Sequence, residues 1–146
     1  MADHRVSIFP RDNDALFDVP ESSKNPGTGI WLYGSNQGFN QVWDFYLQGD
    51  GSWVIYNEAS GLVLDMANSS TDDGTQVIQW GNTDGDNQKW LLLDDSGNQL
   101  RNIEDVAHVQ IVNKHSGKPL GINSPVGLES PVVQNGSINR LTLVKR

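Results

Sequence analysis

The sequence predicts an all-β domain made of three repeated units, and three observations support this prediction. Its apolar segments are runs of four or five residues bounded by Gly, Asn, Asp and Ser, as in short strands joined by turns. Its composition includes 15 Gly and 6 Pro, a mix that favours strands and turns over helices. The same order of residues also recurs along the chain, which is typical of an architecture assembled from equivalent units.

Length and charge limit the class of protein. At 146 residues the chain has the size of one domain that buries its own core. It contains no long apolar run, no signal-peptide pattern and no cysteine, so we expect no membrane insertion and no disulfides. We also expect a cytoplasmic location, or release without a signal peptide. The net charge of −8 argues against nucleic acid as a partner, because that partner requires clustered Lys and Arg.

The first two units, at about 1–48 and 49–105, align at an offset of 47 residues without a gap. The matched positions are Ile8 with Ile55, Asp18 with Asp65, Gly27 with Gly74, Tyr33 with Trp80, Asn40 with Asn87, Gln41 with Gln88, and Trp43 with Trp90. So many polar and aromatic matches at one offset indicate a true repeat.

The third unit, at about 106–146, keeps the apolar frame and has lost the polar residues. Ile111-Val112-Asn113 matches Ile55-Tyr56-Asn57 at an offset of 56. Gly121 then stands where the acid is expected, and Asn135 where the aromatic is expected. Units of this length cannot each bury a core, so we expect the three to share one and to hide their strand edges by closure.

The triplets Gln41-Val42-Trp43 and Gln88-Lys89-Trp90, each near the end of a unit, resemble those of the ricin B-chain type lectins, the Gln-x-Trp β-trefoils. The resemblance covers essentially the whole chain. It implies a β-trefoil of three pseudo-repeats around a closed barrel, with Trp43 and Trp90 in the core. It also implies a non-enzymatic, carbohydrate-binding protein that needs no cofactor.

Asp18 and Asp65 are the candidate acids of two sugar sites. Each follows an apolar run and therefore lies where a strand enters a turn. A turn-forming Asp that bonds its own backbone is the common alternative. However, each acid is followed 15 residues later by an aromatic residue. The resemblance implies that the acid accepts hydrogen bonds from two adjacent sugar hydroxyls, a task that suits the two oxygens of a carboxylate.

Tyr33 and Trp80 are the candidate aromatic platforms. An aromatic residue in the core is the alternative, but Trp80 is followed by the polar segment 81–86, which favours a position on the rim. The resemblance implies that these rings stack on the apolar face of a pyranose. Galactose-type sugars suit such a platform, because their axial 4-hydroxyl leaves one continuous face of C–H groups.

Asn40 and Asn87 complete each polar set, since an amide offers both donors and acceptors to a pair of hydroxyls. The alternative is an Asn in a turn. Gln41 and Gln88 are predicted to brace the backbone and are grouped with the sugar-binding residues. The family often has Gln two residues before the aromatic, where this chain has Trp31 and Ile78, so we expect the polar contact from that position to be absent.

Catalytic and metal sites are not indicated. The acidic pairs lack a complete calcium loop, and the three histidines lack metal-binding spacing. Each unit offers one obvious acid, whereas a glycosidase requires two.

The sequence therefore predicts a lectin with sites in the first and second units and a degenerate third. Expected ligands are terminal galactose or N-acetylgalactosamine on glycoproteins or glycolipids, and two sites would allow cross-linking, as in a hemagglutinin. The sequence is compatible with a homo-oligomer. Two alternatives stay open: a carbohydrate-targeting subunit that works with a separate toxin or enzyme chain, and a trefoil protease inhibitor.

Overall fold

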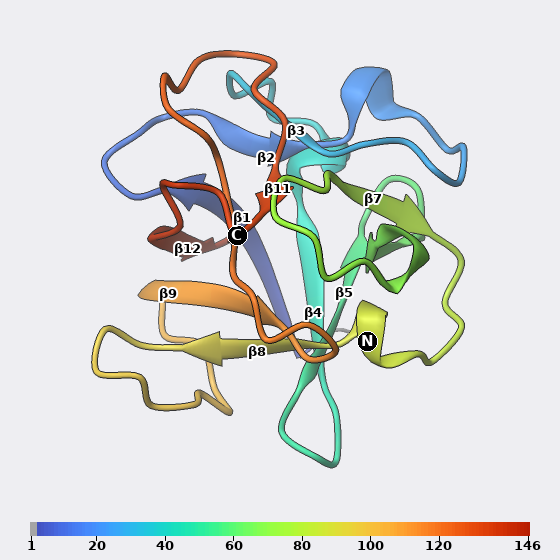
Figure 1. Ribbon diagram of the computed structural model, residues 1–146. Helices are drawn as coiled ribbons and strands as arrows, with labels where there is room; N and C mark the ends of the chain where they lie inside the picture. The colour runs from blue at the N-terminus through green and yellow to red at the C-terminus, as the bar shows by residue number, and fades with distance from the viewer. Residues whose placement is uncertain (1–2) are drawn as a thin grey trace.

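The computed structural model describes residues 3–146, which form short strands, turns and single-turn 3-10 helices (Figure 1). The strands are β1 (His4–Pro10), β2 (Leu16–Asp18), β3 (Trp31–Tyr33), β4 (Trp43–Leu47), β5 (Trp53–Asn57), β6 (Val63–Met66), β7 (Val77–Trp80), β8 (Trp90–Leu93), β9 (Val106–Asn113), β10 (Leu120–Gly121), β11 (Val133–Gln134) and β12 (Leu141–Lys145). The 3-10 helices are η1 (Pro20–Ser22), η2 (Phe39–Gln41), η3 (Ala67–Ser69) and η4 (Asp86–Gln88). Among the described residues, no helix is long and apolar enough to span a membrane.

Six strands form a closed barrel. They pair antiparallel in the order β4-β1-β12-β9-β8-β5, and β5 pairs back with β4. Closure leaves no free edge in this ring, which protects the strands against pairing with other chains. The all-β, β-trefoil prediction is confirmed.

Each unit contributes one hairpin beside the barrel: β2–β3, β6–β7 and β10–β11. In Figure 1 the labelled hairpin strands β2, β3, β7 and β11 lie in the upper half, and β4, β5, β8 and β9 extend below them. The three hairpins share one register, since Asp18 pairs with Trp31, Asp65 with Ile78, and Gly121 with Val133. Equivalent positions of the three pseudo-repeats therefore have equivalent places in the fold.

The core Trp residues connect the barrel to these hairpins. Trp43 and Trp90 are fully buried, as predicted. The indole Nε1 of Trp43 donates to the carbonyl of Phe17 at 3.1 Å, and that of Trp90 donates to the carbonyl of Leu64 at 3.2 Å. Because each carbonyl belongs to the residue before a candidate acid, these bonds fix the backbone that presents Asp18 and Asp65.

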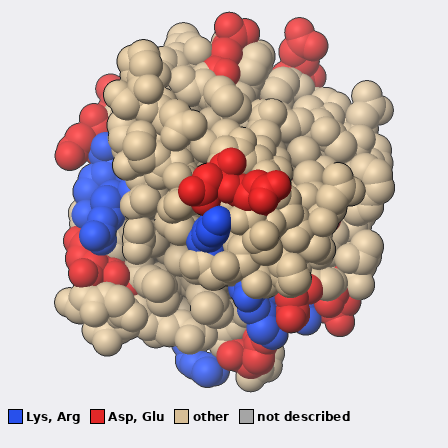
Figure 2. All heavy atoms as spheres, in the orientation of Figure 1, with Lys and Arg blue, Asp and Glu red and all other residues tan. Residues whose placement is uncertain are grey.

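Charge is dispersed over the face seen in Figure 2. Figure 2 shows a face that is mostly uncharged, with small groups in which Lys or Arg lies beside Asp or Glu. An ion pair joins Lys118 Nζ to Asp73 Oδ1 at 2.7 Å. The face in this view presents no continuous basic surface.

Candidate carbohydrate-binding site

Two hollows lie over the first two hairpins, and each brings together the predicted acid, aromatic and amide. The hollow of the second unit has a volume of about 390 Å³ and is lined by Asp65, Ala67, Asn68, Ser69, Ile78, Trp80, Thr83 and Asn87. The hollow of the first unit has about 230 Å³ and is lined by Asp18, Glu21, Ser22, Trp31, Tyr33, Asn36, Asn40 and Glu129. We name them the second hollow and the first hollow.

Asp65 presents one free oxygen to the second hollow. The residue is only 5% exposed, and its Oδ2 accepts a hydrogen bond from Gln88 Nε2 at 2.8 Å. Within residues 3–146, no donor reaches Oδ1. Burial raises the pKa of Asp65 above its usual value, and the amides of Gln88 and Asn87 partly offset that rise. The outcome is a fixed carboxylate with an unused acceptor at the hollow.

Trp80 lines the same hollow. It is the last residue of β7, and strand alternation turns its side chain to the same face as Ile78, whereas Gln79 points inward and is fully buried. The indole is 45% exposed. It also lies beside Gly27 of the first unit, where an added Cβ would be 3.6 Å from the ring. The indole therefore packs against Gly27 and is partly exposed to solvent.

Tyr33 has the equivalent place in the first hollow. It ends β3 and is 41% exposed. Its ring stacks on that of Trp31, with centroids 5.6 Å apart and planes 12° apart. Trp31 also donates from Nε1 to Asp18 Oδ1 at 2.8 Å. The sequence identified this position only by its missing Gln, and the contact between Trp31 and the acid was not foreseen.

Gln41 and Gln88, which the sequence analysis grouped with the sugar-binding residues, lie behind the acids. Both are fully buried. Gln88 Nε2 donates to Asp65 Oδ2 and to the carbonyl of Gly81, each at 2.8 Å, and its Oε1 accepts from the backbone N–H of Thr83 at 2.7 Å.

Gln41 makes the same set of bonds in the first unit. Its Nε2 donates to Asp18 Oδ2 and to the carbonyl of Gly34, each at 2.8 Å, and its Oε1 accepts from the N–H of Asn36 at 3.0 Å. The side-chain amides of Gln41 and Gln88 are hydrogen-bonded within the protein. Both are therefore positioning residues that connect the acid to the neighbouring loop, as predicted from their expected role in bracing the backbone.

The two predicted Asn residues differ in burial. Asn40 is buried, and its Nδ2 donates to Asp18 Oδ2 at 3.2 Å and to the carbonyl of Val19 at 3.1 Å. Asn87 is half-buried, and its Nδ2 donates to the carbonyl of Met66 at 3.2 Å. Only Asn87 therefore keeps much of its amide at the surface of its hollow.

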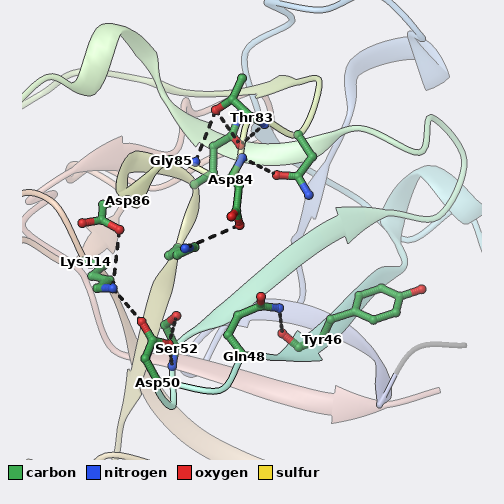
Figure 3. Close-up of polar contacts among 12 residues, drawn as sticks. Tyr46, Gln48, Asp50, Ser52, Thr83, Asp84, Gly85, Asp86 and Lys114 are labelled. Atoms are coloured by element: carbon green, nitrogen blue, oxygen red, sulfur yellow. Dashed lines mark hydrogen bonds and ion pairs between the residues drawn. The ribbon is translucent and has the colours of Figure 1, made fainter.

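Ion pairs hold the loop beside the second hollow (Figure 3). Lys114, from the third unit, lies between Asp50 of the β4–β5 turn at 2.6 Å and Asp86 of η4 at 3.4 Å. A second pair joins Lys89 to Asp84 at 3.5 Å. These pairs are partly exposed, so their contribution to stability is small. Their effect is to restrain the segment that carries Asn87.

Loops on the other side of each hollow are held by the following unit. Gln79 Nε2 donates to the carbonyls of Ser23 and Asn25, which follow η1 of the first hollow. Gln134 Nε2 donates to the carbonyls of Ser70 and Asp72, which follow η3 of the second hollow. The recurrence of Gln79 and Gln134 in the repeats was the available signal for this role.

In the third unit, among residues 3–146, main-chain atoms surround Gly121, which stands at the position of Asp18 and Asp65. A Cβ added at Gly121 would lie 2.6 Å from the carbonyl oxygen of Ile138, and one added at Gly136 would lie 2.5 Å from the carbonyl carbon of Gly121. Ile122 and Ile138 also form a bridge there. No side chain fits where Asp18 and Asp65 sit in the other units.

The closed barrel and its three equivalent hairpins define the chain as a β-trefoil. Residues 2–80 and 39–135 match the model of the family described as "Ricin-type beta-trefoil lectin domain-like". The chain belongs to this ricin-type β-trefoil lectin family, whose fold supports carbohydrate binding and whose domains are typically non-enzymatic. The expected family resemblance is confirmed.

Solved structures agree with this assignment. A designed three-fold symmetric protein, ThreeFoil, is 30% identical to the chain with a TM-score of 0.83, and the match covers 96% of this chain and 97% of that protein. The Macrolepiota procera ricin B-like lectin, solved in complex with lactose, is 18% identical with a TM-score of 0.76, and the match covers 100% of this chain and 98% of the lectin.

An exo-β-1,3-galactanase from Clostridium thermocellum is also similar, at 23% identity and a TM-score of 0.83. The match covers 99% of this chain but only 30% of the enzyme. No sequence among curated proteins matches the chain.

Proposed function

We propose that this domain is a lectin that binds terminal galactose or N-acetylgalactosamine residues of glycans in the first and second hollows. One observation carries the proposal: the free oxygen of Asp65 and the exposed indole of Trp80 line the same hollow. An acceptor and a flat apolar ring in one hollow match the two kinds of surface that a pyranose presents.

The chemistry of the second hollow assigns a role to each group. Asp65 Oδ1 accepts from a sugar hydroxyl, and such charge-assisted bonds are the stronger kind. Asn87 lies beside the acid and offers its amide to the neighbouring hydroxyl. Trp80 covers the apolar C–H face. A galactose-type sugar fits this arrangement because its axial 4-hydroxyl points away from that face.

Affinity at one hollow is expected to be weak. A few hydrogen bonds and one stacked ring correspond to a Kd of about 1 mM, or roughly −4 kcal/mol. Two hollows on one domain would bind a surface that displays many glycans far more tightly, because the second contact is made at a high effective concentration. The lactose complex of the Macrolepiota procera lectin supports a ligand of this sugar class.

A glycan array followed by titration tests the proposal. Wild type should retain galactose-terminated glycans, and Asp65→Ala or Trp80→Ala should abolish binding of lactose at the second hollow while thermal melts still show a folded, cooperative domain. Asp105→Asn is the matched control, since the Asp105 side chain is 97% exposed. An Asp18→Ala/Asp65→Ala double variant that binds glycans as tightly as wild type would refute the site assignment.

A second candidate is a carbohydrate-targeting module that serves a toxin or an enzyme. It is favoured by the similarity to one part of the galactanase and by similarity to a cytolethal distending toxin structure, at 17% identity and a TM-score of 0.70. Such a module would use the same hollows. Co-purification of a separate catalytic chain with the protein from its native source would support it, and isolation of the domain alone would count against it.

A further inference from the structure

We propose that Trp31 caps the acid of the first hollow, so that the two hollows are unequal and the second is the stronger sugar site. The proposal rests on the proposed function and adds a residue that sets the affinity of one site. It follows from a comparison of the hydrogen bonds that each acid already makes.

Asp18 is almost saturated by protein donors. Its Oδ1 accepts from Trp31 Nε1 at 2.8 Å, and its Oδ2 accepts from Gln41 Nε2 at 2.8 Å and from Asn40 Nδ2 at 3.2 Å. A carboxylate has about four acceptor positions, so about one remains for a ligand. A sugar that offers two hydroxyls therefore has to displace a donor or leave one hydroxyl without this partner.

Asp65 has fewer protein donors. Its Oδ2 accepts from Gln88 at 2.8 Å and the nearby amide of Asn87 also favours its charged form, but no side chain of residues 3–146 makes a hydrogen bond to Oδ1 as Trp31 does to Asp18. The difference comes from one position, because Asp18 pairs across its hairpin with Trp31, whereas Asp65 pairs with Ile78. An Ile side chain has no N–H, so nothing at this register position binds the second acid.

The cap is held in place by its surroundings. The ring of Trp31 stacks on that of Tyr33, with planes 12° apart, and this contact restrains the indole near Asp18. The first hollow is also smaller, at about 230 Å³ against about 390 Å³. The side-chain amide of Asn40 is also hydrogen-bonded within the protein, because its Oδ1 accepts from Asn36 Nδ2 at 3.4 Å. Glu21 and Glu129 add carboxylates only at the exposed rim, where water already solvates them.

Two substitutions distinguish the effect of the Trp31 N–H on lactose binding from the effect of the size of its side chain. Trp31→Phe keeps an aromatic ring beside Tyr33 and removes the donor. Trp31→Ile gives the first hollow the residue found in the second. Both are made in the Asp65→Ala background, so that lactose binds only at the first hollow. Binding is followed by NMR titration with lactose, using the amide signals of Gly34 and Gly81 to report the first and second hollows.

We expect each substitution to tighten lactose binding at the first hollow about tenfold, equivalent to about 1.4 kcal/mol. Unchanged or weaker binding in Trp31→Phe would overturn the proposal. Tightening in Trp31→Ile alone would also overturn it, because bulk and not the N–H would then be the cause. Thermal melts identify a variant that fails to fold, in which case the more conservative Trp31→Phe decides.

The same titrations distinguish this inference from the proposed function. Wild type that binds lactose at neither hollow would overturn both. Wild type that binds lactose at the second hollow, together with Trp31 variants that gain nothing at the first, would overturn only the capping role.

Discussion

Replacing Gln88 by Ala removes the amide that joins the acid of the second hollow to its loop. In the wild type this side chain donates to Asp65 Oδ2 and to the carbonyl of Gly81, and it accepts from the N–H of Thr83. Gln88 is fully buried, so Ala leaves these three groups without their partner and a small cavity beside them. A fourth bond, from the Thr83 hydroxyl to Oε1 at 3.2 Å, is also lost, but Thr83 is exposed and its hydroxyl can turn to water.

The magnitude follows from these bonds. Each lost hydrogen bond costs about 1 kcal/mol net, and a bond to a charged group costs more, so the loss of three corresponds to about 3 kcal/mol. Water from the hollow can reach Asp65 and Gly81, which keeps the total near this figure. For a domain of this size, 1 kcal/mol lowers the melting temperature by about 2–4 °C, so Gln88→Ala should lower it by about 6–12 °C.

Circular dichroism melts and lactose titrations measure the two consequences. Gln48→Ala is the matched control, because Gln48 makes one local bond, to the carbonyl of Tyr46 at 3.0 Å (Figure 3). The control should melt within about 3 °C of wild type, since one bond contributes about 1 kcal/mol. Gln88→Ala should also bind lactose more weakly, because Asp65 is no longer oriented. Equal melting temperatures for the two variants would refute the structural role of Gln88.

Three further predictions concern backbone packing and titration. Gly121→Ala should destabilise the fold by about 1–3 kcal/mol, because its Cβ would lie 2.6 Å from the carbonyl oxygen of Ile138. Gly81→Ala is the control and should not destabilise it, since no atom lies within 4 Å of the added Cβ. Equal midpoints of the two variants in urea titrations would contradict this prediction. Burial raises the pKa of Asp65 above its ordinary value of 3.8, so the carboxylate is protonated at a higher pH than usual. Lactose binding at the second hollow should therefore weaken as the pH falls, already above pH 3.8. NMR titrations with lactose at decreasing pH test this prediction, and an affinity that does not change with pH would contradict it. Burial and the neighbouring carboxylate of Glu58 raise the pKa of Asp44 from 3.8 to about 7, which favours its protonated form in the fold. The stability that this gives should be lost as the pH rises from 3.8 to about 7. Asp44→Asn should remove this part of the dependence in melts across that range, and an unchanged dependence would contradict the reasoning.

The sequence was sufficient for the fold and for the composition of each hollow because both depend on repetition. Asp18, Tyr33 and Asn40 recur as Asp65, Trp80 and Asn87 at one offset, and a β-trefoil places equivalent residues in equivalent positions. Repetition also predicts that the third unit lacks the acid and the aromatic, since Gly121 and Asn135 stand at those positions. The repeats in the sequence predict which residues lie together, but they do not predict the hydrogen bonds that each residue makes.

The sequence does not specify the direction in which each side chain points. The spacing of Gln88 placed it beside Asp65, but only the coordinates show that both ends of its amide are used inside the protein. The contact of Trp31 with Asp18 depends on the register of a hairpin, which a run of apolar residues does not specify. Closure around Gly121 likewise depends on how closely two backbone segments approach, and a Gly in the sequence does not show what fills its space.

The bonding pattern also explains why the third unit retains polar residues although its own hollow is closed. Gln134 holds the loop that follows η3, Asn113 donates from Nδ2 to the carbonyl of Asn87 at 3.0 Å, and Lys114 pairs with Asp86. All three therefore serve the second hollow. Each hollow is completed by the unit that follows it in the chain, so a unit can lose its acid and its aromatic and still be required for sugar binding by its neighbour.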